Sequence, residues 1–255
     1  MNKLAIDEIR KKREFSELPL IDIELAYSKF EKKQVSDEEK IRLTKELLRK
    51  IFSAFVSKKL LSLKNKDEEW ILRKHMSTRE RLPHYAEIYK KIFKDYKKAS
   101  VIDLGAGING FSYSFFKKSG INVDYTAIES VGQLVDLMNF YFKKEKITGK
   151  AVHLSLFDKK KVLELISREK FPRVVLLFKI IDALESLKRD YSMELISDVA
   201  QIVERLVLSF PTKSLGSRER FHAKRNWIIN FLKNNFKILD DFEISGERYI
   251  VFARK

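Results

Sequence analysis

Residues 101–110 read Val-Ile-Asp-Leu-Gly-Ala-Gly-Ile-Asn-Gly, and the fold prediction for the whole chain starts from this stretch. Apolar residues around one aspartate indicate a short buried strand, and the glycine-rich turn runs directly into a helical pattern that ends near residue 118. Glycines let the backbone approach a ligand closely, and the free N–H groups at the start of a helix stabilise polar groups. The stretch therefore predicts a ligand-binding turn between a strand and a helix.

The class of ligand is narrowed by the spacing of the glycines and by two carboxylates. Gly105, Gly107 and Gly110 match G-x-G-x-x-G, which occurs in sites for NAD, FAD and S-adenosylmethionine and also in purely structural turns. Glu129 closes the next predicted strand, where a carboxylate accepts hydrogen bonds from both ribose hydroxyls. Asp103 is placed to accept from loop amides or to face a methionine ammonium group. These features favour S-adenosylmethionine, with a dinucleotide as the second choice.

The composition indicates a basic protein with a substantial core. Of 255 residues, 44% are hydrophobic, and 52 Lys and Arg against 36 Asp and Glu give a net charge of +16. Such an excess makes a polyanion the first partner to consider, although a lysine-rich surface also serves solubility alone. Cysteine is absent and the four histidines show no metal-binding spacing, so we expect no disulfide, thiol nucleophile or metal site.

Nothing in the sequence indicates a membrane segment or a secretion signal. No apolar run reaches spanning length, and residues 1–8 lack the apolar core of a signal peptide. We therefore expect a cytoplasmic protein with no membrane partner, and a monomer.

Two domains are predicted from the change of pattern near residue 95. Residues 1–95 show helical periodicity throughout, including a capping box at residues 36–39 in which Ser36 caps the N–H of Glu39. We expect this helical N-terminal domain to bind RNA through its basic exterior, while a plain helical bundle is the better explanation for most of its residues. Residues 96–255 form the second domain.

Strands and helices alternate along the second domain. Strands are expected at residues 101–104, 123–128, 151–154, 174–178, 206–210, 236–244 and 248–253. The last two are joined by the tight turn Ser245-Gly246 and must be antiparallel. This order predicts an α/β fold: the Rossmann-like sheet of class I S-adenosylmethionine-dependent methyltransferases, with a C-terminal antiparallel hairpin that an NAD domain does not need.

Residues 75–84 read His-Met-Ser-Thr-Arg-Glu-Arg-Leu-Pro-His, just upstream of the helix that leads into the glycine strand. A planar guanidinium binds a carboxylate through two hydrogen bonds, and the methionine part of the cofactor carries such a carboxylate. Arg79 or Arg81 is therefore expected to hold it. The alternative is a solvated ion-pair cluster on a helix surface, which contributes little to stability.

Four blocks carry a family resemblance: residues 75–82, residues 103–109, Leu-Leu-Phe-Lys at 176–179 followed by Leu-Glu at 184–185, and Ser-Phe-Pro-Thr-Lys-Ser-Leu-Gly-Ser-Arg at 209–218. Together they resemble the aminoglycoside-resistance 16S rRNA (guanine-N7) methyltransferases, the Arm/Rmt group and its relatives in antibiotic producers. The resemblance spans residues 70 to 255 in the same order. It departs at residues 106–110, where the family usually has Cys-Gly-Leu-Asn-Pro, and at residues 219–222, where a Gly-rich basic segment is usual.

The resemblance implies a cofactor site and a substrate. S-adenosylmethionine would be bound by His75, Arg79, Arg81, Asp103, Gly105, Ala106, Gly107, Asn109, Glu129, Ser155 and Leu156. Ser155-Leu156 align where the family has Asp-Leu or Asp-Val, which leaves the adenine contacts open. The implied substrate is 16S rRNA in the 30S subunit, and the target is N7 of a guanine near the decoding site.

The chemistry needs no general base, because guanine N7 carries an in-plane lone pair and no proton at neutral pH. Rate enhancement then comes from alignment and desolvation, with the base extruded from its stack. Lys179, Lys213 and Ser214 are the predicted catalytic residues, which fix the guanine, although a strand-end lysine that reaches solvent explains Lys179 equally well. The predicted RNA contacts are Lys213, Arg218, Arg220, Lys224 and Arg225, with a solvated helix face as the alternative for the last three.

Other functions stay open at this point. A methyltransferase acting on tRNA or on another rRNA nucleotide fits the same motifs, as does a non-catalytic RNA-binding ribosome factor that keeps the fold. A dinucleotide oxidoreductase is disfavoured by the terminal hairpin and the basic charge.

Overall fold

The computed structural model describes residues 3–52, 67–212 and 225–255. Within these residues a seven-stranded sheet has the order β3-β2-β1-β4-β5-β7-β6. The first five strands are mutually parallel, and β7 lies antiparallel between β5 and β6. The predicted sheet with its C-terminal hairpin is confirmed. The strands are β1 (Lys98–Leu104), β2 (Asn122–Glu129), β3 (Gly149–His153), β4 (Arg173–Phe178), β5 (Arg205–Pro211), β6 (Phe236–Ile244) and β7 (Glu247–Arg254).

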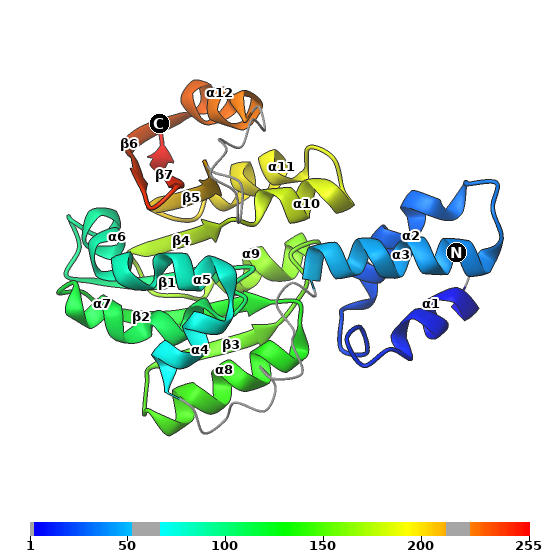
Figure 1. Ribbon diagram of the computed structural model, residues 1–255. Coiled ribbons are helices and arrows are strands. Elements are labelled where there is room, and N and C mark those ends of the chain that lie inside the picture. The colour runs from blue at the N-terminus through cyan, green and yellow to red at the C-terminus, as the bar shows by residue number, and fades with distance from the viewer. Residues whose placement is uncertain (1–2, 53–66, 213–224) are drawn as a thin grey trace.

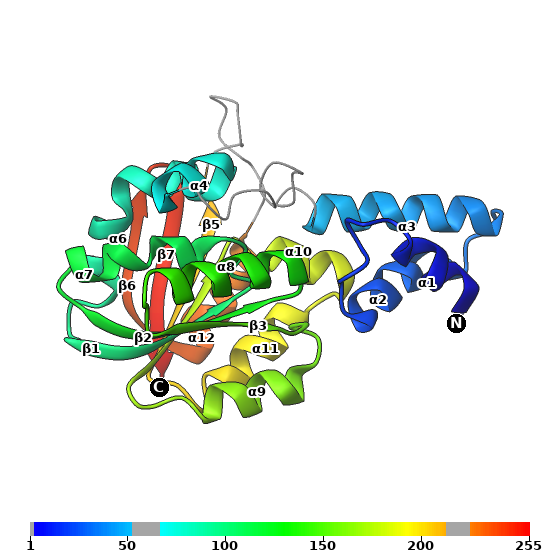
Figure 2. The ribbon, with the colours of Figure 1, turned by 90° about the horizontal axis from the view of Figure 1, so that it is seen from below.

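Helices cover both faces of the sheet, as Figure 2 shows. Alternation along β1 explains why: Val101 belongs to the core on one face and Ile102 to the core on the other. The first face is covered by α6 (Tyr85–Ile92), α7 (Tyr113–Lys118) and α8 (Gly132–Lys144). The second is covered by α9 (Lys159–Ser167), α10 (Ile181–Leu187), α11 (Tyr191–Val199) and α12 (Asn226–Asn235).

The N-terminal helices fall into two groups (Figure 1). Helices α1 (Lys3–Arg10), α2 (Leu20–Glu31) and α3 (Asp37–Phe52) pack on one another beside the sheet, and Ser36 accepts the predicted capping hydrogen bond from Glu39 at 3.2 Å. Helices α4 (Glu68–Lys74) and α5 (Met76–Arg81) lead through the 3₁₀ turn Leu82–His84 into α6, and this group packs against α7 and the 3₁₀ turn η4 (Asn109–Ser112). The division of the chain at residue 95, and RNA binding by the first part, stay predictions.

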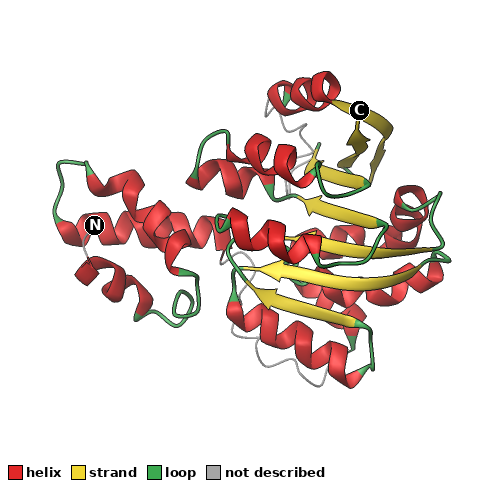
Figure 3. Ribbon diagram, turned by 180° about the vertical axis from the view of Figure 1, so that it is seen from behind, coloured by secondary structure: helices red, strands yellow, loops and turns green. Residues whose placement is uncertain are grey.

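The topology places a crevice where β1 meets β4. The chain runs outward from β1 to β2 and β3, then returns to β4 on the other side of β1, so the crossovers diverge at this point. The parallel strands point toward the side on which α1, α2 and α3 lie (Figure 3). None of the helices in the described ranges combines the length and the apolar character needed to cross a membrane.

Candidate functional site

A cavity of about 390 Å³ opens at the carboxyl ends of the parallel strands, which is within the usual size range of small-molecule sites. Its walls come from parts of the chain that are far apart in sequence, including the ends of the N-terminal helices. They include Asp22, Ile51 and Phe52; His75, Ser77, Thr78 and Arg81; Gly105, Ala106, Gly107 and Ile108; Glu129 and Ser130; Leu156 and Phe157; and Phe178, Lys179, Ile180 and Asp182.

The predicted glycine turn forms one wall, and its shape requires glycine. Gly105 and Gly107 have φ angles of +67° and +56°, a conformation that other residues rarely adopt. A Cβ atom on Gly105 would also lie 2.5 Å from Cδ1 of Ile180. The turn is tied to the neighbouring strand, since the amide of Gly105 donates to the carbonyl of Ile128 at 2.9 Å. Backbone therefore lines the cavity at a point where a side chain would fill it.

Glu129, at the end of β2, lies in the cavity wall where the sequence placed it. Its Oε2 accepts a hydrogen bond from the amide of Gly107 at 2.8 Å, and its Oε1 accepts from the amide of Val131 at 2.9 Å. Burial raises the pKa of this carboxyl group, and the two amides act in the opposite direction. Each oxygen keeps a second lone pair, so the carboxylate orders the glycine turn and can still accept from a ligand.

Asp103 and Asn109 support the turn and are absent from the cavity walls. Oδ2 of Asp103 accepts from Nδ2 of Asn109 at 2.7 Å and from the hydroxyl of Tyr125 at 2.6 Å. Oδ1 of Asn109 in turn accepts from the hydroxyl of Tyr85 at 2.7 Å. In the structure these two side chains bond each other and support the glycine turn, and their predicted contact with a cofactor stays a prediction.

The two arginines of residues 75–84 lie in different surroundings. Arg81 is 4% exposed and lines the cavity, and Arg79 is exposed on the same short helix. Nε of Arg81 donates to Oε2 of Glu247 at 2.9 Å, and Nη2 donates to Oε1 at 2.8 Å. Its guanidinium also lies 4.7 Å from the ring centre of Phe178. The geometry thus favours Arg81 as the residue facing a ligand, with one edge of its guanidinium already bound to Glu247.

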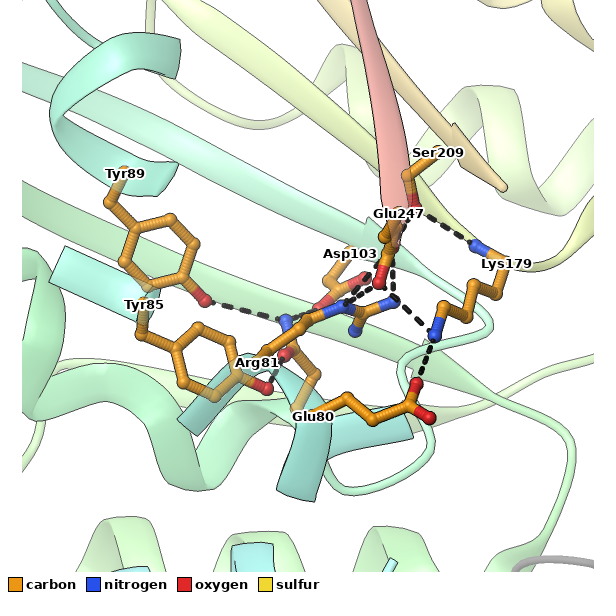
Figure 4. Close-up of polar contacts among 9 residues, drawn as sticks. Glu80, Arg81, Tyr85, Tyr89, Asp103, Lys179, Ser209 and Glu247 are labelled. Carbon is orange, nitrogen blue, oxygen red and sulfur yellow. Dashed lines mark hydrogen bonds and ion pairs between the residues drawn. The ribbon is translucent and has the colours of Figure 1, made fainter. Parts of the chain in front are cut away.

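Lys179 directly follows β4, and its side chain reaches Glu247, the partner of Arg81 (Figure 4). Its Nζ lies 2.9 Å from Oε2 of Glu80 and 3.2 Å from Oε2 of Glu247. Its φ angle of +55° is unusual for a residue with a side chain, and such strain concentrates at functional sites. Burial disfavours the charged form of Glu247, but Arg81 and Lys179 outweigh burial and hold the pKa of Glu247 below its usual value. Two cations and two carboxylates therefore form a neutral cluster.

The remaining predicted cofactor residues divide between the cavity and the layer behind it. His75 is buried in the wall, where burial and the charges of Arg81 and Lys179 lower its pKa to about 3, so its imidazole is neutral at physiological pH. Leu156 lines the cavity. Ser155 lies behind it, and its hydroxyl donates to Asp22 at 2.5 Å.

The sequence prediction missed two carboxylates, Asp22 and Glu247. Glu247 begins β7 opposite Pro211 of β5, and Ser209 donates a further hydrogen bond to it. The tight turn before β7 was the available signal, because it returns the chain to the cavity end of β5. Asp22 offered no comparable signal, since it comes from a helix that lies 133 residues before its partner Ser155 in the chain.

Of the residues predicted to contact RNA, the structure describes only Arg225. Arg225 is buried and donates from Nη1 and Nη2 to the carboxylate of Asp182, at 2.8 and 2.6 Å. This pairing places it at the rim of the cavity, bound within the chain and not extended into solvent. Lys213, Ser214, Arg218, Arg220 and Lys224 lie outside the described residues.

Three curated proteins similar to this chain share one description. A 16S rRNA (guanine(1405)-N(7))-methyltransferase of Micromonospora rosea is 33% identical over 147 residues, which cover 57% of this chain and 50% of that protein. A protein of the same description from Proteus mirabilis is 23% identical over 189 residues, covering 72% of this chain and 64% of its own length. The chain thus spans about half the length of the first of these relatives.

Solved structures of similar fold cover the chain more fully. The 16S rRNA methyltransferase RmtF, in complex with S-adenosyl-L-homocysteine, superposes with a TM-score of 0.80 at 20% identity and covers all of both chains. The 16S rRNA methylase ArmA gives a TM-score of 0.59 at 25% identity, over 77% of this chain and 97% of its own.

A family model described as ribosomal RNA methyltransferase (FmrO) matches residues 41–243, which include the glycine turn, Glu129 and Lys179. With the matching fold, this match over most of the chain shows that the protein belongs to the FmrO family of ribosomal RNA methyltransferases.

Proposed function

We propose that this protein transfers a methyl group from S-adenosylmethionine to N7 of a guanine near the decoding site of 16S rRNA in the 30S subunit. The observation that carries the proposal is the cavity at the crevice between β1 and β4, in which the Gly105–Gly107 turn is bonded to Glu129. The relatives support the substrate, since those of Micromonospora rosea and Proteus mirabilis are described as 16S rRNA (guanine-N7)-methyltransferases.

The residues of the cavity fit the parts of this cofactor one by one. Glu129 offers acceptors to the ribose hydroxyls, and the backbone of the glycine turn lies beside it. Arg81 supplies a cation for the methionine carboxylate from the edge of its guanidinium that Glu247 leaves open. Leu156 and Phe157 provide an apolar surface for the adenine ring.

When bound, S-adenosylmethionine supplies an electrophilic methyl group on a positively charged sulfur. The chain has to place a guanine in line with that methyl group and exclude water. Two of the three donors of Lys179 face Glu80 and Glu247, which leaves one for the O6 atom beside guanine N7. His75 is neutral, and the reaction gives it no proton to accept. Lys179 is thus the group we expect to orient the base.

We assign the excess positive charge of the chain to binding of the ribosomal substrate. A net charge of +16 favours binding to RNA phosphates, and we assign part of this binding to the helical region of residues 1–95 and part to Lys213, Arg218, Arg220 and Lys224. Lys213 and Ser214 are kept as catalytic candidates beside Lys179. We propose that the protein acts as a cytoplasmic monomer on 30S subunits.

The experiment is transfer of tritiated methyl groups to defined RNA substrates. Purified protein and labelled S-adenosylmethionine are incubated in three separate reactions, which contain 30S subunits, 50S subunits or tRNA from a drug-sensitive bacterium. We expect label in 30S subunits and none in the other two. Label confined to tRNA or to 50S subunits would refute the proposed substrate, and no label in any RNA, with the cofactor bound, would refute methyl transfer.

A further inference from the structure

A carboxylate from the N-terminal helices reaches into the cavity. Asp22 lies in the first turn of α2 and is 1% exposed, and it forms part of the cavity wall. The hydroxyl of Ser155, which follows β3, donates to Oδ1 of Asp22 at 2.5 Å. The side chain therefore joins α2 to the carboxyl edge of the sheet.

The second oxygen of this carboxylate has no partner. Among the described residues, Oδ2 of Asp22 is one of the few buried side-chain atoms that form no hydrogen bond. An unsatisfied buried acceptor is costly, and a bound molecule that supplies the missing donor is a common reason for keeping one. Because Asp22 lines the cavity, a molecule bound there can supply that donor.

The segment after β3 has no other side-chain acceptor to offer at this point. The hydroxyl of Ser155 gives its proton to Asp22 and accepts the amide of Phe157 at 3.0 Å. The next carboxylate, Asp158, caps α9 by accepting from the amide of Lys161 and also pairs with the side chain of that lysine. Asp22 is therefore the carboxylate that serves the β3 side of the cavity.

Strand order indicates which part of the proposed cofactor would lie there. Along the sheet edge, Ser155 with Asp22 follows β3, Glu129 ends β2, the glycine turn follows β1, and Lys179 follows β4. Arg81, the candidate for the methionine carboxylate, contacts Glu247 of β7 at the far end of this series. A ribose at Glu129, as the proposed function has it, would direct the adenine ring toward β3, where Leu156 and Asp22 line the cavity.

We propose that Asp22 is a cofactor-binding residue that accepts a hydrogen bond from the exocyclic 6-amino group of the adenine of S-adenosylmethionine. The inference rests on the proposed function and adds to it a source of adenine specificity and a direct link between the N-terminal helices and the cofactor. The amino group has two N–H donors and the free oxygen of Asp22 accepts one of them. A 6-oxo base in the same place would set a carbonyl oxygen against the carboxylate.

The test compares two ligands on the full-length protein by isothermal titration calorimetry: S-adenosylhomocysteine and S-inosylhomocysteine, in which oxygen replaces the 6-amino group. The wild type is expected to prefer the adenosyl compound. Asp22→Asn should weaken its binding about 10- to 100-fold. The same variant should bind the inosyl compound more tightly than the wild type does, because the amide group that this substitution introduces can donate to the 6-oxo group. Asp136→Asn, at an exposed position of α8, is the matched control and should change neither affinity.

The outcomes separate the inference from the proposed function. If the wild type binds S-adenosylhomocysteine and Asp22→Asn keeps both its affinity and its preference, the role of Asp22 is refuted while the proposed function stands. An equal loss of affinity for both ligands in Asp22→Asn also refutes it, because a merely structural side chain would behave in this way. If the wild type binds neither compound, both the inference and the proposed function fail.

Discussion

The buried carboxylate of Asp22, which we propose binds the cofactor, should make the cofactor-free protein less stable at neutral pH than at acidic pH. Burial raises the pKa of this carboxyl group from 3.8 to about 6, while the hydroxyls of Ser155 and Ser130 and the nearby His153 act in the opposite direction. The charge of Asp22 in turn helps to raise the pKa of Glu129, which also lines the cavity. Because the folded state holds the proton of Asp22 more tightly than the unfolded state does, Asp22 stabilises the fold fully below pH 3.8.

The first prediction follows from that pKa. As the pH rises from 3.8 to about 6, the contribution of Asp22 to the free energy of unfolding should be lost, by about 3 kcal/mol in total. Denaturant unfolding of the cofactor-free wild type and of Asp22→Asn at pH 4 and pH 7 measures it. The wild type should lose stability relative to the variant between these two values. If the difference in unfolding free energy between the two proteins were the same at both pH values, the pKa of Asp22 would not be raised.

Substitutions of Arg81 and Arg79 should show which of the two arginines binds the cofactor. Arg81→Lys keeps a charge near Glu247 but loses the planar donor set, so affinity for S-adenosylmethionine should fall about tenfold in calorimetry. Arg79→Ala changes an exposed side chain and should leave that affinity unchanged. Weaker binding in Arg79→Ala together with normal binding in Arg81→Lys would reverse the assignment.

At the scale of elements, the glycine turn is the feature that positions the site. Gly105 and Gly120 both have positive φ angles, of +67° and +79°, but their surroundings differ. A Cβ on Gly105 meets Ile180, whereas a Cβ on Gly120 meets nothing within 4 Å. The two positions therefore separate backbone strain from steric conflict in the cavity.

We predict that Gly105→Ala loses most of its affinity for S-adenosylmethionine, because the turn must shift away from Ile180 and from its bond to Ile128. Gly120→Ala should cost about 1–3 kcal/mol of stability through strain alone and leave cofactor binding intact. Calorimetry and thermal unfolding of both variants measure the two effects. Normal cofactor binding by Gly105→Ala would mean that the turn does not form the site.

The elements themselves were largely predictable from the sequence, and the partners of their side chains were not. Alternating apolar residues and glycines set the strands, the turn and the hairpin, and the end of β2 pointed to Glu129. Arg79 and Arg81 are two residues apart and face different sides of a helix, and nothing local says which side meets the cavity. Asp22 and Glu247 reach the site from distant segments, so only the assembled fold reveals them.

The same limit applies to the helices before β1. Periodicity identified α4, α5 and α6 as helices, but it could not show that they pack against α7 and not beside α3. Tyr85 and Tyr89 show the reason, since their hydroxyls contact Asn109 and Ser112 in the interior of the α/β unit. Such contacts depend on the tertiary arrangement and leave no local pattern.

At the scale of the whole molecule, the excess positive charge should govern binding to the ribosome but not to the cofactor. Between 50 and 200 mM KCl we expect the apparent KM for 30S subunits to rise by about tenfold or more, because each neutralised phosphate releases counterions. The Kd for S-adenosylhomocysteine should change little over the same range. Steady-state kinetics and calorimetry test the pair, and a KM that is insensitive to salt would argue against binding through phosphates.

The central claim is that the cavity delivers a methyl group to N7 of one guanine of 16S rRNA. Its most direct measurement is the position of the modified base: 30S subunits treated with the protein and S-adenosylmethionine are reduced with borohydride, cleaved with aniline and mapped by primer extension. We predict a single new stop at a guanine near the decoding site, absent when Glu129→Ala replaces the wild type. A stop elsewhere in 16S rRNA, or none in subunits that carry label, would contradict the account.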